Sequence, residues 1–91
     1  IHRQKTMRMR RVNHTQVSLD YFQRIEDLRQ GGYRLVFDTS KTMLIGVWAA
    51  LLVHQNGRRV RLIYNQHNDH LRQYSNDKLV YDSKRPKMCE S

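Results

Sequence analysis

The sequence is short of cysteine, and this shortage limits where the protein is expected to work. Cys89 is the single cysteine among 91 residues, so no disulfide can form within the chain. Because small domains in oxidising compartments commonly rely on disulfides, one cysteine favours a reducing compartment. We therefore expect a cytoplasmic, nucleoid or nuclear location, although a chain that begins at Ile1 leaves secretion open.

Hydrophobic residues are also scarce, at 38% of the chain against roughly 45–50% in an ordinary domain. The longest apolar run, residues 43–53, is too short to cross a bilayer as a helix, which takes about 20 residues. The sequence therefore predicts no transmembrane segment, and one domain with a thin core. We expect a basic and flexible N-terminal arm over residues 1–15, a compact α+β domain over 16–83 and a polar tail over 84–91.

Acidic residues are few, and the resulting charge imbalance is the strongest signal in the sequence. Eight Asp and Glu face seventeen Lys and Arg, which gives a formal net charge of +9. Twelve of the basic residues are Arg, whose planar guanidinium binds phosphate through two parallel hydrogen bonds and stacks on bases. This composition favours nucleic acid, either DNA or RNA, as the partner.

The positive charge is concentrated in two segments. Residues 1–12 contain five basic residues and no acid, and residues 58–74 contain four Arg and one Asp. Tyr74 lies among polar residues, as does Tyr81, and an exposed tyrosine ring can stack on a base. The predicted nucleic-acid-binding residues are Arg8, Arg10, Arg11, Arg58, Arg59, Arg61, Arg72 and Tyr74.

The pattern over residues 19–30 predicts an amphipathic helix. Ser18 is a suitable N-cap, because its hydroxyl can accept a hydrogen bond from a free backbone amide of the first turn. Tyr21, Phe22, Ile25 and Leu28 then follow at helical spacing. Two glycines at 31–32 are expected to end the helix.

Residues 33–37 read as a strand, and residues 43–54 read either as a buried helix or as the first strand of a hairpin. Asn56-Gly57 suits both readings, as a helix C-cap or as a two-residue type I′ turn. A two-residue loop would pair Val53 with Val60 and Leu51 with Leu62, on the face opposite Arg59 and Arg61. This separation of apolar and basic side chains favours the hairpin.

The C-terminal third is expected to contain a short helix over 71–74 and a last strand over 79–81. The complete pattern predicts an α+β fold, with one amphipathic helix packed on a three- to four-stranded antiparallel sheet. No catalytic residue and no cofactor is predicted. His67 and His70 have a spacing that fits one face of a helix, but zinc sites usually need three or four ligands, so no metal site is predicted.

Two alternative functions accompany nucleic-acid binding. A helix, then Gly31-Gly32, then the strand over 33–38 and an apolar strand resembles the central part of the RelE/ParE toxin fold, over roughly a third of the chain. Several members of that family are ribonucleases, so the resemblance implies RNA cleavage as an alternative. A protein-interaction module is the second alternative, with an acidic protein partner or a homodimer that covers the apolar segment around Trp48.

Overall fold

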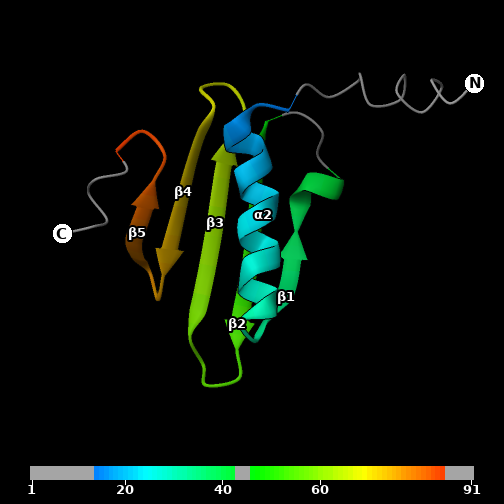
Figure 1. Cartoon of the computed structure of the whole chain (residues 1–91), viewed down its shortest axis with the longest axis vertical. Coiled ribbons are helices and arrows are strands. Elements are labelled where there is room, and N and C mark those ends of the chain that lie inside the picture. The colour runs from blue at the N-terminus through cyan, green and yellow to red at the C-terminus, as the bar shows by residue number, and fades with distance from the viewer. Residues whose placement is uncertain (1–13, 43–45, 86–91) are drawn as a thin grey trace, which may run out of the picture.

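The computed structural model describes residues 14–42 and 46–85, and they form one helix packed on a five-stranded antiparallel sheet (Figure 1). The strands follow one another across the sheet in chain order. This is the predicted α+β fold, with five strands instead of three or four. The elements are α2 (Gln16–Gln30), β1 (Tyr33–Asp38), the short 3-10 helix η1 (Thr39–Lys41), β2 (Val47–His54), β3 (Arg59–Asn65), β4 (His70–Ser75) and β5 (Lys78–Asp82).

The helix begins one turn earlier than predicted. Thr15, and not Ser18, is the N-cap, and the Thr15 hydroxyl accepts a hydrogen bond from the Ser18 amide at 3.0 Å. Both residues are good N-caps, and the choice follows from tertiary contacts: Ser18 is buried, and Thr15 also donates to Asp69 beyond β3. At the other end, Gly32 has a φ of +99°, a left-handed conformation that suits glycine.

The core lies between α2 and the sheet face that it crosses. Leu52, Leu62 and Leu71, from three neighbouring strands, are fully buried beneath the helix. Aromatic rings of α2, β2 and β3 pack edge to face or tilted against one another, with Tyr21 and Trp48 at a centroid distance of 5.4 Å. The buried cluster contains Tyr21, Ile25, Trp48, Ala50, Leu52, Leu62, Tyr64 and Leu71. No helix among the described residues is long and apolar enough to span a membrane.

The β2–β3 hairpin is confirmed, but its predicted register is wrong by one residue. Instead of facing Val60, Val53 faces Arg59, and Leu52 faces Val60. Because side chains alternate between the faces of a sheet, a shift of one residue exchanges the two faces of β2. Leu52 is therefore in the core, and Leu51, which the predicted register put inside, lies on the opposite face.

The cause of the register shift is a loop of three residues in place of two. The His54 amide donates to the Arg58 carbonyl at 2.9 Å, and the Gly57 amide donates to the His54 carbonyl at 2.8 Å. Gly57 has a φ of +94°, so the loop is a type I turn followed by a left-handed residue that forms a bulge. Asn56 and Gly57 do make the turn, and Gln55 belongs to it as well.

The helix predicted over 71–74 is wrong, because this segment is strand β4. The residues that follow explain the difference. Asn76 and Asp77 have φ values of 50° and 70°, and Ser75 pairs with Lys78 across them. Two left-handed residues in succession form a type I′ turn, which joins antiparallel strands tightly. The last strand, predicted over 79–81, is β5 and extends by one residue at each end.

Candidate nucleic-acid interface

The sheet has two faces, and α2 lies across one of them (Figure 1). We call the opposite face the outer face. The strand register places one row of side chains on it that crosses all five strands. In order from β1 to β5, the row consists of Phe37, Leu51, Arg61, Tyr74 and Leu79. Neighbouring strands lie about 4.8 Å apart, so successive members of this central row are in reach of each other.

Arg61 and Tyr74 form the middle of the central row. The guanidinium carbon of Arg61 lies over the Tyr74 ring, 5.1 Å from its centroid, as in a cation–π pair. Arg59 precedes Arg61 by two residues on β3 and therefore projects from the same face. Both arginines are exposed, and the Arg61 side chain is 45% exposed. The predicted common face of Arg59 and Arg61 is thus present in the fold.

Asp77, which was not among the predicted site residues, lies beside Arg59 and Arg61. Asp77 Oδ1 lies 3.4 Å from Arg61 Nη2, and Asp77 Oδ2 lies 3.9 Å from Arg59 Nη2. The Asp77 side chain is 72% exposed, so these ion pairs are in solvent and contribute little stability, on the order of 0–1 kcal/mol. Such pairs are able to open when another group offers better contacts.

The turn that carries Asp77 is fastened to the start of β3. The Arg59 amide donates to the Asn76 side-chain oxygen at 3.0 Å, and the Asn76 amide donates to the Arg59 carbonyl at 2.8 Å. These two bonds fix the β4–β5 turn beside β3, although the two segments are 17 residues apart. The position of Asp77 next to Arg61 is therefore determined by the hydrogen bonds of Asn76 and does not depend on the ion pairs alone.

A hollow of about 160 Å³ lies on the outer face, lined by Leu51, Arg59, Arg61, Tyr74 and Asp77. Larger hollows of about 380 and 470 Å³ lie against α2. Those two are lined partly by carboxylates of the helix, Asp20 in both. A polyanion is better matched by the outer-face hollow, with two arginines and one carboxylate, than by either of these two, in spite of its smaller size.

The other predicted residues are distributed more widely. Arg72 belongs to the next row of the outer face, between Ile63 of β3 and Asp82 of β5. Arg58 is exposed at the end of the hairpin, where alternation puts it on the side of α2. Arg8, Arg10 and Arg11 lie outside the described residues. Tyr81, the other tyrosine considered for base stacking, does not lie on the outer face: its ring is on the helix side, with the Arg24 guanidinium carbon 3.7 Å from the ring centroid.

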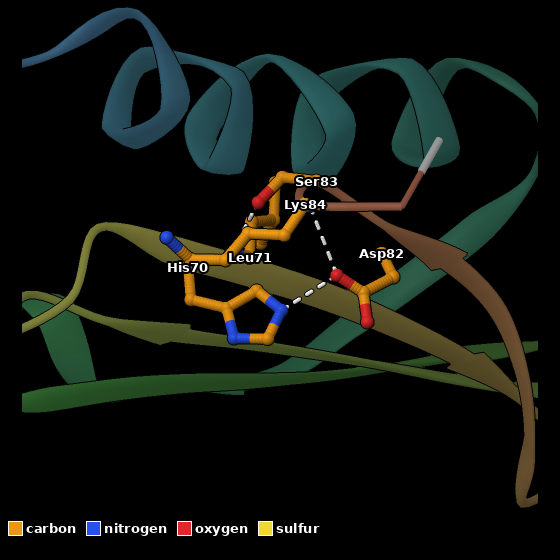
Figure 2. Close-up of polar contacts among 5 residues, drawn as sticks. All are labelled: His70, Leu71, Asp82, Ser83 and Lys84. Carbon is orange, nitrogen blue, oxygen red and sulfur yellow. Dashed lines mark hydrogen bonds and ion pairs between the residues drawn. The ribbon is translucent and has the colours of Figure 1, made fainter. Parts of the chain in front are cut away.

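His70 and Asp82 form a partly buried polar contact between β4 and β5. His70 Nε2 lies 2.6 Å from Asp82 Oδ1, and the same oxygen accepts from the Lys84 amide at 3.0 Å (Figure 2). Burial raises the pKa of the Asp82 carboxyl, but the hydrogen bonds from His70 and Lys84 outweigh burial and hold this pKa below its ordinary value. Asp82 is therefore ionised at neutral pH, so Nε2 of His70 carries the proton of this bond.

This contact connects the last strand to the sheet. Ser83 adds to it, since its hydroxyl accepts from the Leu71 amide at 2.9 Å and its amide donates to the Leu71 carbonyl at 2.8 Å (Figure 2). His67, in contrast, is exposed in the β3–β4 turn. Over residues 14–42 and 46–85, no three His, Cys, Asp or Glu side chains come together as metal ligands. The partner of His70 is Asp82, in a contact that supports the fold.

Replacing Asp82 by Asn is expected to destabilise the fold by about 1–3 kcal/mol at neutral pH, because the buried partners of the carboxylate lose a charged acceptor. A carboxyl with a lowered folded-state pKa stabilises the fold above its unfolded pKa. That stabilisation is lost as the pH falls through the folded-state pKa, so the difference between wild type and variant should shrink in acid. Urea unfolding at several pH values measures this difference in stability.

The matched control is Asp77→Asn, which removes an exposed carboxylate and for which we expect a loss of less than about 0.5 kcal/mol. Equal losses in both variants would contradict the stabilising role of Asp82.

Several residues of the outer face were not among the predicted site residues, including Arg34, Phe37 and Asp77. Arg34 pairs with Val53 and is exposed, and Phe37 ends the central row with 46% of its surface exposed. A signal for Asp77 was available, because Asn-Asp between two strand-like segments is typical of a type I′ turn. Interpreting residues 71–74 as a helix concealed that turn. A bulge in β1 between Leu35 and Phe37 sets the face of Phe37, and the sequence carries no comparable signal for it.

Comparisons with protein-family models, with curated proteins and with solved structures found no match for this chain. The resemblance to the RelE/ParE toxins therefore stays a prediction from the sequence.

Proposed function

We propose that the protein binds nucleic acid through the outer face of its sheet. The observation that carries the proposal is the placement of Arg59 and Arg61 side by side on this face, with Tyr74 in the same row as Arg61. Alternate residues of one strand lie about 7 Å apart along the backbone, which allows their two guanidinium groups each to contact a different phosphate. Phosphate contacts of this kind supply most of the affinity of a non-specific nucleic-acid-binding protein.

The distribution of charge over the two layers supports the same face. On α2, Asp20, Glu26 and Asp27 exceed Arg24 and Arg29, so the helix layer is slightly acidic. The outer face has four arginines, and of its two carboxylates Asp82 is buried against His70. These arginines are Arg34, Arg59, Arg61 and Arg72. Among the described residues, the outer face therefore presents more positive charge to an approaching polyanion than α2 does.

The aromatic and apolar side chains of the central row make the outer face more than a positively charged surface. Tyr74 and Phe37 offer aromatic rings, and Leu51 lies between β1 and Arg61. Sheets that present aromatic rings among basic residues are a common platform for nucleic acids, because bases stack on the rings while arginines hold the backbone. Arg8, Arg10 and Arg11 of the predicted arm are proposed to add phosphate contacts.

A salt titration of binding tests the proposal. The full chain is titrated with single-stranded DNA, single-stranded RNA and duplex DNA, labelled with a fluorophore, at a series of salt concentrations. We expect log K to fall linearly with log salt, with a slope near −0.7 for each phosphate contacted on a single strand. Heparin and polyglutamate serve as competitors. If either displaces the nucleic acid as well as unlabelled nucleic acid does, the protein is a general polyanion or acidic-protein binder, and the proposal fails.

A further inference from the structure

The hollow on the outer face has the size of one heterocycle. Its volume of about 160 Å³ is roughly half of the lower end of small-molecule pockets, which begin near 300 Å³. A complete nucleotide does not fit into such a space, but a planar base can enter it edge first or lie flat across it. The outer face thus offers one defined position in addition to its phosphate contacts.

The hollow is lined by two kinds of side chain: apolar surfaces from Leu51 and Tyr74, and polar groups from Arg59, Arg61 and Asp77, which we call the rim. Leu51 and the half-buried Tyr74 ring, two members of the central row, provide surfaces against which a planar ring can pack. Arg61, in the same row between them, contributes a flat guanidinium. Stacking of a base on an aromatic ring or a guanidinium is worth about 1–3 kcal/mol and does not select among the bases. A preference for one base must therefore come from the hydrogen-bonding groups of the rim.

The rim combines hydrogen-bond donors with a hydrogen-bond acceptor. Arg59 and Arg61 offer only N–H donors, and the ionised carboxylate of Asp77 offers only acceptors. Asp77 now pairs with Arg61 at 3.4 Å and with Arg59 at 3.9 Å, and both ion pairs are exposed and weak. Replacing these ion pairs by contacts with a base therefore costs little free energy. The turn position of Asp77, held by the two Asn76–Arg59 hydrogen bonds, presents the carboxylate in advance of binding.

Guanine is the base whose edges match this rim. Its N1–H and N2–H groups are adjacent donors that a carboxylate accepts together, and its O6 and N7 atoms are acceptors that an arginine binds as a pair. Adenine and cytosine each place a ring-nitrogen acceptor beside their amino donor, so a carboxylate meets one repulsive contact there. Uracil and thymine flank a single N–H with two carbonyl oxygens, which is less favourable for a carboxylate still.

We propose that this hollow is a binding site for a single unpaired guanine base of a nucleic-acid strand, with Asp77 accepting from its Watson–Crick edge. The inference rests on the proposed nucleic-acid binding and specifies its ligand. The base must be unpaired, because pairing occupies the edge that Asp77 contacts. The arginines alone provide affinity for any strand, and Asp77 reduces that affinity through its charge while adding preference for guanine.

Binding of single-site oligonucleotides tests this inference on the full chain. The probes are a fluorescent oligouridylate of about twelve nucleotides, within the range that one sheet platform covers, and three versions with one central G, A or C. We expect the guanine probe to bind roughly 5- to 100-fold more tightly than the others, which is the discrimination of a good bidentate pair. Annealing the guanine probe to its complement should remove this advantage.

Asp77→Asn provides the decisive variant, and Asp27→Asn is its matched control. Both remove one negative charge, but Asp27 lies on α2. We expect D77N to lose the preference for guanine while binding plain oligouridylate at least as tightly as wild type, and D27N to keep the preference. Circular dichroism establishes that both variants are folded.

The outcomes separate the inference from the function on which it rests. Equal affinity of the wild type for all four single-stranded probes, or an unchanged preference in folded D77N, would overturn the guanine site and leave nucleic-acid binding intact. Failure of the wild type to bind any probe at low salt would overturn the proposed function, and the guanine site with it.

Discussion

Replacing Arg59 and Arg61 together by alanine is expected to lower the affinity for single-stranded nucleic acid roughly 10- to 100-fold at low salt. Each guanidinium that bonds to a phosphate contributes a charge-assisted contact of about 1.5 kcal/mol or somewhat less when exposed. The slope of log K against log salt should become shallower by about 1.4, because two phosphate contacts are lost at about 0.7 each. The double variant also leaves Asp77 without its two cationic neighbours, so its charge then repels the strand.

The control for this prediction is a second pair of cations on other elements. Arg29 of α2 and Lys41 of η1 are both exposed, and replacing them by alanine changes the net charge by the same amount. If the outer face is the binding surface, the control pair should reduce affinity only slightly and change the salt slope by much less. Equal effects of the two double variants would mean that net charge, and not this face, determines binding. Fluorescence anisotropy at several salt concentrations measures both quantities.

Leu52→Ala is expected to cost about 2–5 kcal/mol of unfolding free energy, which is a large share of the roughly 5–15 kcal/mol of a small domain. Leu52 is fully buried beneath α2, so removing its side chain leaves a cavity among the packed rings and leucines of the core. Urea unfolding followed by tryptophan fluorescence reports the loss, since the buried Trp48 belongs to the same cluster.

Its neighbour Leu51 is the matched control, with the same side chain on the opposite face of the same strand. Leu51 is only partly buried, and its truncation removes contacts at the surface without opening an enclosed cavity. We expect Leu51→Ala to cost less than about 1.5 kcal/mol and to weaken binding of nucleic acid. A larger loss of stability for L51A than for L52A would contradict the observed register and support the register with the two-residue loop.

The fold class and the helix were predictable because both depend on local pattern. Helical spacing of apolar residues and the glycines at 31–32 predict one helix, and the helix extends to Gln30. The alternation along β3 predicted correctly that Val60, Leu62 and Tyr64 share a face, away from Arg59 and Arg61. Strand β4 was missed because its two apolar residues, Leu71 and Tyr74, are three residues apart, a spacing that fits one face of a helix. Only the turn after β4 identifies it as a strand.

The candidate site was predictable only in part, because it is made from segments that the sequence does not bring together. Arg59 and Arg61 were found through charge and alternation. Asp77 entered the site through two hydrogen bonds between Asn76 and Arg59, one of them to the Asn76 side chain, which form only when β4 and β5 are in place. Tyr74 and Tyr81 look equivalent in the sequence, yet the structure separates them.

That separation shows how small backbone irregularities decide a surface. Register shifts by one residue in the β4–β5 ladder, where Gln73 pairs with Tyr81 and Tyr74 pairs with Leu79. Tyr81 therefore lies on the helix side, where Arg24 covers it, and Tyr74 lies on the outer face beside Arg61. Because strict alternation is broken at a bulge, the face of a side chain beyond it cannot be counted from the sequence.

By itself the sequence determined the net charge of +9, the single cysteine, the extent of the apolar segments and the alternation along β3. These properties follow from residue types and their spacing along one stretch of chain. The tertiary structure decided which strands pair, which face of β2 is buried and which carboxylate stands beside the arginines. Those outcomes depend on the lengths of the loops, which contain the left-handed residues Gly57, Asn76 and Asp77. A loop that is one residue longer or shorter exchanges the buried and outer faces of the strand that it joins.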